Sequence, residues 1–133
     1  MKTFLLVVFT VLSLATFSQN NKFYTAETGK GDSVKIAIKI DDNIIIDSTS
    51  LDRILRLTIK HSTGLCKNET SFAPYKKSVF HIVKEADNES STNKYLVCVY
   101  FNYLASNAYG AEGEINVCCT FNSEFLYRKI VSE

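Results

Sequence analysis

The chain has 133 residues, of which 46% are hydrophobic and 22% are charged, a balance typical of a globular protein. Its 15 Lys and Arg residues are nearly balanced by 14 Asp and Glu residues, which gives a formal net charge of +1. A nucleic-acid-binding domain normally carries a clear basic excess, because phosphate contacts dominate its affinity. We therefore expect no nucleic-acid partner.

The first 18 residues have the pattern of a secretory signal peptide. Lys2 gives the positive start, residues 4–17 are mostly apolar, and Thr16 and Ser18 put small side chains at the cleavage-recognition positions. A membrane span needs about 20 apolar residues, and this run is shorter. We expect cleavage after Ser18 and export to the periplasm or the extracellular space. One domain, over residues 19–133, would remain, with no membrane span of its own.

Export bears on the four cysteines, because disulfides persist in oxidising compartments. All four lie beyond the signal peptide, and their even number predicts two bridges: Cys66, Cys98, Cys118 and Cys119. No CxxC spacing occurs, so the sequence supports neither a zinc site nor a thioredoxin-like motif. We expect no metal and no cofactor.

Residues 34–40 alternate apolar and polar side chains, the pattern of a half-buried strand. The segment before it, 29–33, is rich in glycine and reads as a turn. After it, residues 41–43 are typical of a tight loop, with Asn43 suited to a left-handed conformation. This predicts a hairpin in which Ile40 faces Ile44 across the loop.

A helix is expected over residues 51–61, where apolar side chains recur at helical spacing. Ser50 would cap its start and Gly64 would end it. Leu57 and Ile59 alternate as a strand would, which leaves a strand as the alternative for this segment.

The rest of the chain is predicted to be mainly β. Residues 65–77 read as a loop and 86–93 as a polar turn. The last strand has a rival interpretation as a short helix capped by Ser123. Enrichment in Val, Tyr, Phe and Ile predicts strands over 78–85, 94–103, 114–121 and 125–131.

The two strongest strands would be joined by a turn over residues 106–110, in which Asn107 and Gly110 supply the turn geometry. Pairing Phe101 with Ile115 places Cys98 opposite Cys118, which makes a bridge between those two the leading expectation. Cys66 would then pair with Cys119. A one-residue bulge at Gly110 would exchange the roles of Cys118 and Cys119.

Leu96 and Tyr100 lie on the opposite side of their strand from Val97 and Val99. Side chains of this kind are costly to leave in water as a patch. Either the helix or another strand of the domain covers them, or they form an interaction surface for a partner protein.

Helix 51–61 is followed by Pro74 and Ser78-Val-Phe80, and the Tyr- and Val-rich strand leads into an Asn107-Ala-Tyr-Gly-Ala111 turn. This order resembles a family of small exported bacterial domains without an established function. The resemblance implies a compact α+β domain, and it implies no catalytic residues.

A catalytic alternative rests on the two histidines. His61 and His81, with Lys76 or Arg56 as a cation, would suit acid–base cleavage in a small secreted hydrolase or nuclease. Each histidine also has an ordinary structural interpretation, at a helix end or on a strand surface. Asn68 and Asn88 each begin a glycosylation sequon, but about one such match is expected by chance in a chain with ten asparagines, so they carry little weight.

Taken together, these features predict an α+β fold: an antiparallel sheet with one helix packed against it. The predicted role is that of an exported, disulfide-bonded module that acts by binding and not by catalysis. The expected partner is another envelope or secreted protein.

Overall fold

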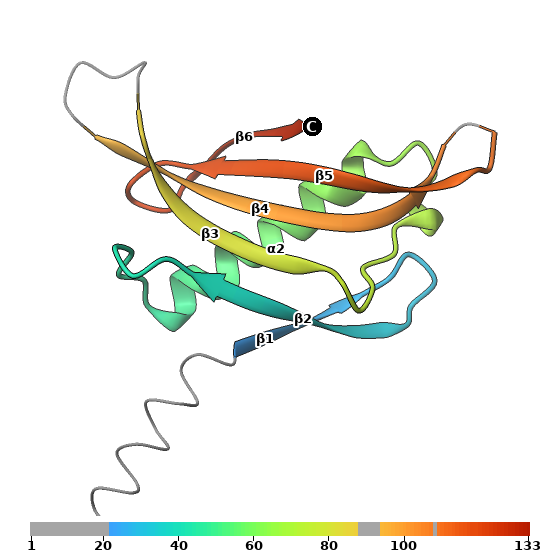
Figure 1. Ribbon diagram of the computed structural model, residues 1–133, viewed down its shortest axis with the longest axis horizontal. Coiled ribbons are helices and arrows are strands. Elements are labelled where there is room, and N and C mark those ends of the chain that lie inside the picture. The colour runs from blue at the N-terminus through green and yellow to red at the C-terminus, as the bar shows by residue number, and fades with distance from the viewer. Residues whose placement is uncertain (1–21, 88–93, 108) are drawn as a thin grey trace, which may run out of the picture.

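The structure is a computed structural model that describes residues 22–87, 94–107 and 109–133. Six strands form one sheet, and one α-helix packs across it (Figure 1). The elements are β1 (Lys22–Glu27), β2 (Ser33–Ile40), α2 (Ser48–Leu65), the short 3₁₀ helix η1 (Glu69–Ser71), β3 (Val79–Ala86), β4 (Tyr95–Ser106), β5 (Glu112–Phe121) and β6 (Tyr127–Ser132). The expected signal peptide, residues 1–18, and the sequon at Asn88 lie outside the described residues.

The strands lie in the sheet in the order of the sequence, from β1 to β6. Every neighbouring pair is antiparallel except β2 and β3, which are parallel. Parallel strands need a crossover between them, and α2 makes that crossover here. The predicted α+β class is confirmed, but the expected antiparallel sheet is a mixed one.

The predicted hairpin between residues 34–40 and 44–46 is wrong. β2 has a neighbour on each side, because β1 pairs with one of its edges and β3 with the other. Residues 44–46 therefore find no free edge; they lead into α2, and Ile44 and Ile46 pack on the core. Strand β1 was not predicted, although the turn expected over 29–33 joins β1 to β2.

The predicted helix is confirmed and is longer than expected at both ends. Asp47 is the N-cap, because its Oδ1 accepts a hydrogen bond from the Ser50 backbone at 2.7 Å. Ser50 therefore lies in the first turn and is not the cap. The helix passes through Gly64 and ends at Leu65.

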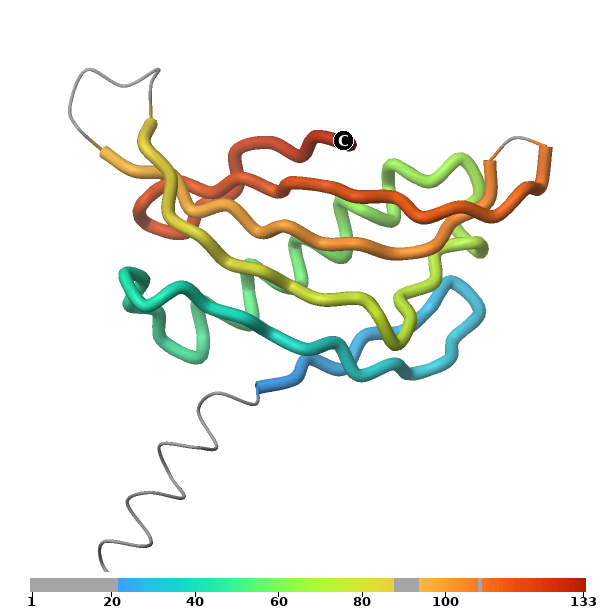
Figure 2. The backbone as a smooth tube through the Cα atoms, in the orientation of Figure 1, coloured from blue at the N-terminus to red at the C-terminus, as the bar shows by residue number. Residues whose placement is uncertain are grey.

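The core lies between α2 and one face of the sheet, and Figure 2 shows the helix crossing obliquely behind the strands. Ile54 and Leu55 of the helix are fully buried. Burying a side chain of this size stabilises the fold by about 1.5–3 kcal/mol. The sheet contributes alternate residues to this core, among them Ile36, Phe80, Ile82, Val97, Val99, Phe101, Tyr103, Val117, Cys119 and Phe121.

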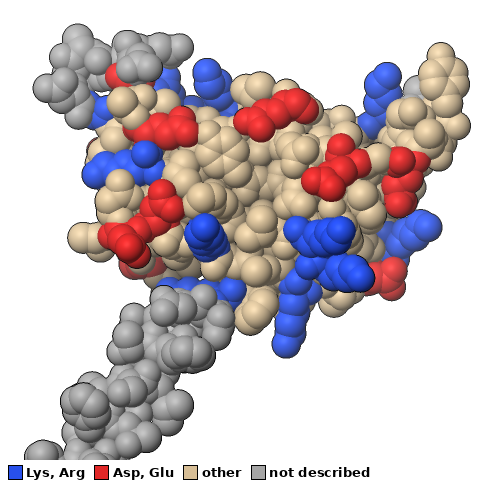
Figure 3. All heavy atoms as spheres, viewed as in Figure 1, with Lys and Arg blue, Asp and Glu red and all other residues tan. Residues whose placement is uncertain are grey.

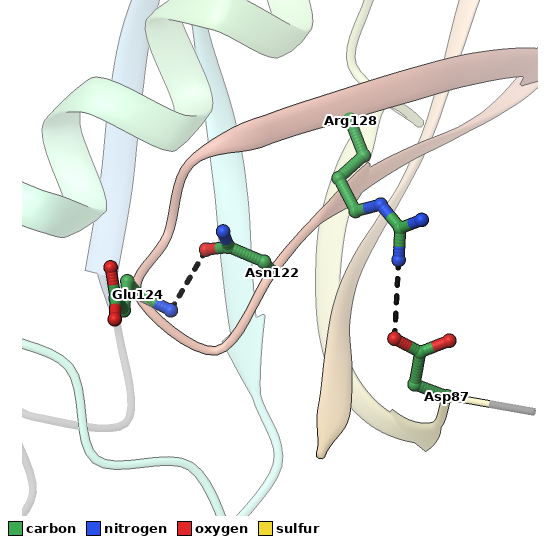
Figure 4. A network of polar contacts seen from close by, with 4 residues as sticks. All are labelled: Asp87, Asn122, Glu124 and Arg128. Atoms are coloured by element: carbon green, nitrogen blue, oxygen red, sulfur yellow. Dashed lines mark hydrogen bonds and ion pairs between the residues drawn. The ribbon is translucent and has the colours of Figure 1, made fainter. Parts of the chain in front are cut away.

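The last strand, β6, replaces the rival helix. Asn122 forms a turn in place of the expected Ser123 cap: its Oδ1 accepts hydrogen bonds from the backbone of Glu124 at 2.9 Å and of Leu126 at 3.0 Å (Figure 4). Phe125 has a φ of 62°, a left-handed conformation that reverses the chain into β6.

Candidate functional site

The face of the sheet turned away from α2 is the candidate site, and we call it the open face. Side chains alternate along a strand, so Leu96, Cys98 and Tyr100 of β4 point to this face while Val97 and Val99 point to the helix. Leu96 and Tyr100 are half-buried. The expected intramolecular cover by the helix is wrong for these two side chains, because α2 packs on the opposite face.

Uncharged side chains occupy the middle of the open face, with charged side chains around them (Figure 3). Val131 of β6 belongs to this face, because it lies opposite Cys118 in the sheet, and it is 49% exposed. The open face is thus a mainly uncharged surface with a charged rim, formed chiefly by the central and C-terminal strands.

The register of β4 and β5 differs by two residues from the expected one. Phe101 faces Val117, so Cys98 lies opposite Thr120 and Cys118 lies opposite Tyr100. The set of residues that share the helix-facing side was predicted correctly, because a shift of two residues preserves the faces.

The cause of the shift is the turn between the two strands. Pairing closes at Ser106 and Glu112, and Asn107 Oδ1 accepts hydrogen bonds from the backbone of Tyr109 and Ala111 at 2.9 and 3.0 Å. Gly110 has a φ of 80°, so its predicted left-handed role is confirmed. It lies inside the loop and makes no bulge in the paired strands.

Cys98 and Cys118 are diagonal neighbours on the open face. Cys98 is 2% exposed, while Cys118 is half-buried. Hydrogen bonding to the Cys98 thiol lowers the pKa of Cys118 to about 7, and the Thr120 and Tyr100 hydroxyls act in the same direction. The same contact with Cys118, together with burial, raises the pKa of Cys98. The hydrogen bond with the Cys98 thiol therefore favours the thiolate form of Cys118.

Three polar side chains complete the surroundings of the cysteine pair. Tyr100 donates a hydrogen bond from its hydroxyl to Glu85 Oε1 at 2.5 Å, which raises the pKa of Tyr100. The Thr120 hydroxyl lies 3.9 Å from the Cys118 sulfur. Neither Glu85 nor Thr120 was expected at a site from the sequence, although the alternation of β3 and β5 places both on the open face.

A hollow of about 320 Å³ opens beside the cysteine pair. Its lining includes Leu96, Cys98, Cys118, Thr120, Lys129 and Val131. At its rim, Arg128 of β6 forms an ion pair with Asp87, just beyond β3, at 3.2 Å (Figure 4). Because β4 and β5 lie between β3 and β6 in the sheet, this pair spans the hollow's end.

The other two cysteines lie on the helix side. Cys119 is fully buried, interacts with Thr58, and has its pKa raised to about 11 by burial. Cys66 follows the end of α2, and its Sγ donates to the Ser62 carbonyl at 3.5 Å. Thr58, which Cys119 contacts, lies about 12 Å along the helix axis from Cys66, at 1.5 Å per residue. Cys119 and Cys66 are therefore not neighbours. All four cysteines are free thiols in the structure, so neither expected bridge is formed.

The two histidines do not share a cleft. His61 belongs to α2 and stacks on Tyr127, whose partner Phe121 faces the helix. His81 lies between the buried Phe80 and Ile82 on β3, so it points to the open face, where Asp41 pairs with it at 2.9 Å. The sheet separates the two imidazoles.

Two further segments noted in the sequence lie in a turn and at a helix cap. Residues 28–32 form the turn between β1 and β2, where the Thr28 side chain accepts hydrogen bonds from the backbone of Lys30 and Asp32. Asn68 caps η1 with its side chain. Within residues 22–87, 94–107 and 109–133, no cluster of three or more His, Cys, Asp or Glu residues is arranged to hold a metal ion. No helix in those ranges is long and apolar enough to cross a membrane.

Comparisons with protein-family models, with curated proteins and with solved structures find no match to this chain. The resemblance to small exported domains therefore stays a prediction.

Proposed function

We propose that this protein is an exported binding module whose open face holds a second secreted or envelope protein. The observation that carries the proposal is that α2 covers one face of the sheet and leaves Leu96 and Tyr100 on the other. A sheet face is usually buried against a second layer of structure, and a partner would supply that layer.

The chemistry of the open face indicates the kind of partner. Interfaces between proteins commonly have an apolar and aromatic centre within a polar rim, and tyrosine is frequent among the residues that dominate affinity. Tyr100 lies near the middle of the open face, with Leu96 on the same strand and Val131 two strands away. A partner with an exposed aliphatic or aromatic patch fits this surface.

Catalysis by the two histidines is not part of the proposal. General acid–base catalysis requires both groups to reach one substrate, within about 3 Å of the atoms that exchange protons. His61 and His81 lie on opposite sides of the sheet, so no single substrate contacts both.

Site-specific photo-crosslinking tests the binding surface. A photoreactive phenylalanine analogue would replace Tyr100 in the protein produced by its native host. The matched control places the same analogue at Tyr109, which is 95% exposed in the turn between β4 and β5. We expect position 100 to capture one discrete protein and position 109 not to capture it. Capture of the same protein from both positions, or of none from position 100, would contradict the proposal.

A second variant separates binding from folding. Leu96→Lys adds a charge to the open face on the same strand as Tyr100, while the lysine side chain remains free to reach solvent. We expect crosslinking from position 100 to be lost while the denaturation midpoint stays close to that of the parent protein. Export is tested separately, by sequencing the N-terminus of the secreted protein, which is expected to begin at Gln19.

A further inference from the structure

The two thiols on the open face differ in accessibility. Cys118 is half-buried beside the hollow, where an outside reagent can reach it, whereas Cys98 lies beneath the surface at 2% exposure. An accessible sulfur with a shielded one beside it is the arrangement of an attacking and a resolving cysteine.

The surroundings of Cys118 favour its thiolate, which is the nucleophile in thiol chemistry. The Cys98 thiol and the Thr120 and Tyr100 hydroxyls all lower the pKa of Cys118, and Lys129 lines the same hollow. Cys119, the next residue in the chain, points to the core and has no such access. The open face thus distinguishes two adjacent cysteines.

The spacing of the pair makes a bridge between them a strained one. Cys98 and Cys118 are diagonal in the β4–β5 ladder, and diagonal Cα atoms are about 7–8 Å apart. Unstrained disulfides have Cα atoms about 4.4–6.8 Å apart. Because the strands are already hydrogen-bonded side by side, closing this bridge requires them to shift locally along each other, which strains the disulfide. Strained disulfides are the more easily reduced ones.

We infer that Cys98 and Cys118 are a reversible thiol–disulfide pair that exchanges electrons with external disulfides through the hollow on the open face. The oxidant is a low-molecular-weight disulfide or an exposed protein disulfide. This inference does not rest on the proposed binding partner, because the pair needs only access to the hollow.

The exchange has two steps. The Cys118 thiolate attacks one sulfur of the external disulfide, the S–S bond breaks, and the departing thiolate takes a proton from water. Cys98 then gives its proton to solvent and attacks the Cys118 sulfur, the mixed S–S bond breaks, and the second external thiolate leaves and takes a proton from water. Overall, two cysteine thiols are oxidised to one disulfide, and one external disulfide is reduced to two thiols.

A redox titration with glutathione tests the inference. The reduced protein would be equilibrated with a series of ratios of reduced to oxidised glutathione, quenched with acid, alkylated and mapped by peptide mass spectrometry. We expect a Cys98–Cys118 bridge that appears with a single midpoint and is lost again when reduced glutathione is added. A bridge between other cysteines, no bridge, or one that remains oxidised throughout the series would overturn the inference.

Two variants separate the steps. Cys98→Ala should stop the reaction at a mixed disulfide between glutathione and Cys118, and Cys118→Ser should form neither the mixed disulfide nor the bridge. Cys66→Ala is the control and should retain the full titration, since Cys66 lies at the end of α2. Absence of the mixed disulfide in a folded Cys98→Ala protein would also overturn the inference. Photo-crosslinking from position 100 in the Cys118→Ser protein tests binding without the thiol pair. Capture of the partner there would show that the binding function and the thiol exchange are separate.

Discussion

His61 of α2 stacks on Tyr127 of β6, with ring centroids 3.8 Å apart and ring planes within 7° of parallel. β6 is an edge strand, with a hydrogen-bonded neighbour only on the β5 side. The stack therefore connects the helix to the strand that has the least support from the sheet. Arg53 adds a second connection, since its guanidinium donates to the Phe125 carbonyl at 3.3 Å in the turn before β6.

The stack predicts coupled effects of substitution. His61→Ala and Tyr127→Ala should each lower the free energy of unfolding, and the double variant should lose less than the sum of the two. The expected coupling is about 0.5–1.5 kcal/mol, the range for aromatic pairs. Urea denaturation of the four proteins measures it. The matched control cycle combines His61→Ala with Tyr109→Ala. Tyr109 is distant and exposed, so these two effects should add. An additive result for His61 and Tyr127 would contradict the role of the stack.

Two glycines are predicted to respond to alanine in opposite ways. A Cβ on Gly29 would overlap the Glu69 carbonyl oxygen, and the Gly29 N–H donates to the Phe72 carbonyl at 2.7 Å. Gly29→Ala must push the β1–β2 turn away from η1, and overpacking of this kind typically costs about 1–3 kcal/mol.

Gly64 is the matched control, because it lies in the last turn of α2 with open space where the Cβ of an alanine would lie. Gly64→Ala should leave stability unchanged or raise it by up to about 1 kcal/mol, since alanine is the better helix former. Thermal denaturation of both variants measures the difference. A Gly29→Ala protein as stable as Gly64→Ala would show that η1 does not pack closely against the turn.

Sequence patterns predicted the elements better than their partners. Alternation in residues 34–40 correctly assigned Ile36 to the buried face, but alternation does not say which strand lies alongside. The hairpin with residues 44–46 was inferred from a short loop that suits a tight turn. The structure instead continues into α2, because β1 and β3 occupy both edges of β2.

The candidate site was predicted only in part, because alternation gives the face of a strand but not its neighbours. Period-two alternation placed Leu96 and Tyr100 on the face of β4 away from Val97 and Val99, and that grouping is confirmed. Which residues of β5 lie opposite those of β4 depends on where the turn closes. The Asn107 side chain closes it by accepting hydrogen bonds from backbone N–H groups, which a residue pattern does not reveal. The contribution of Glu85 was out of reach, since it requires knowing that β3 lies beside β4.

The four cysteines should react with iodoacetamide in a defined order. Cys118 should react first at neutral pH, because its pKa is lowered to about 7. Cys98 and Cys119 should react last in the folded protein, because both are buried and the pKa of each is raised. The rate at Cys118 should rise as the pH increases through about 7, where the thiolate becomes the main form.

Mass spectrometry of timed samples, with each cysteine resolved on its own peptide, measures these rates. In Cys98→Ala the hydrogen bond to Cys118 is lost, so the midpoint of the Cys118 profile should move to higher pH. If the rate of alkylation of Cys118 in the unsubstituted protein rose with a midpoint at the ordinary pKa of a free thiol, that result would contradict the thiol–thiol contact.

The cap of α2 predicts a pH dependence of stability. Hydrogen bonds from the Ser50 backbone and side chain lower the pKa of Asp47 below its ordinary value of 3.8. A carboxyl group with a lowered pKa in the folded state stabilises that state above its unfolded pKa, and the contribution is lost as the pH falls through the folded value. Asp47→Ala should therefore be less stable than the parent protein at neutral pH, with the difference shrinking in acid.

Asp47→Asn is the matched control, because asparagine is an equally good N-cap but does not titrate. It should keep most of the stability at neutral pH and lack the acid-dependent loss assigned to the carboxylate. Urea midpoints of the three proteins, followed from neutral pH to below the ordinary aspartate pKa, compare them directly. If Asp47→Ala differed from the parent protein by the same amount throughout this range, the carboxylate would contribute only as a neutral hydrogen-bond acceptor, and the charge at the helix start would have no measurable effect.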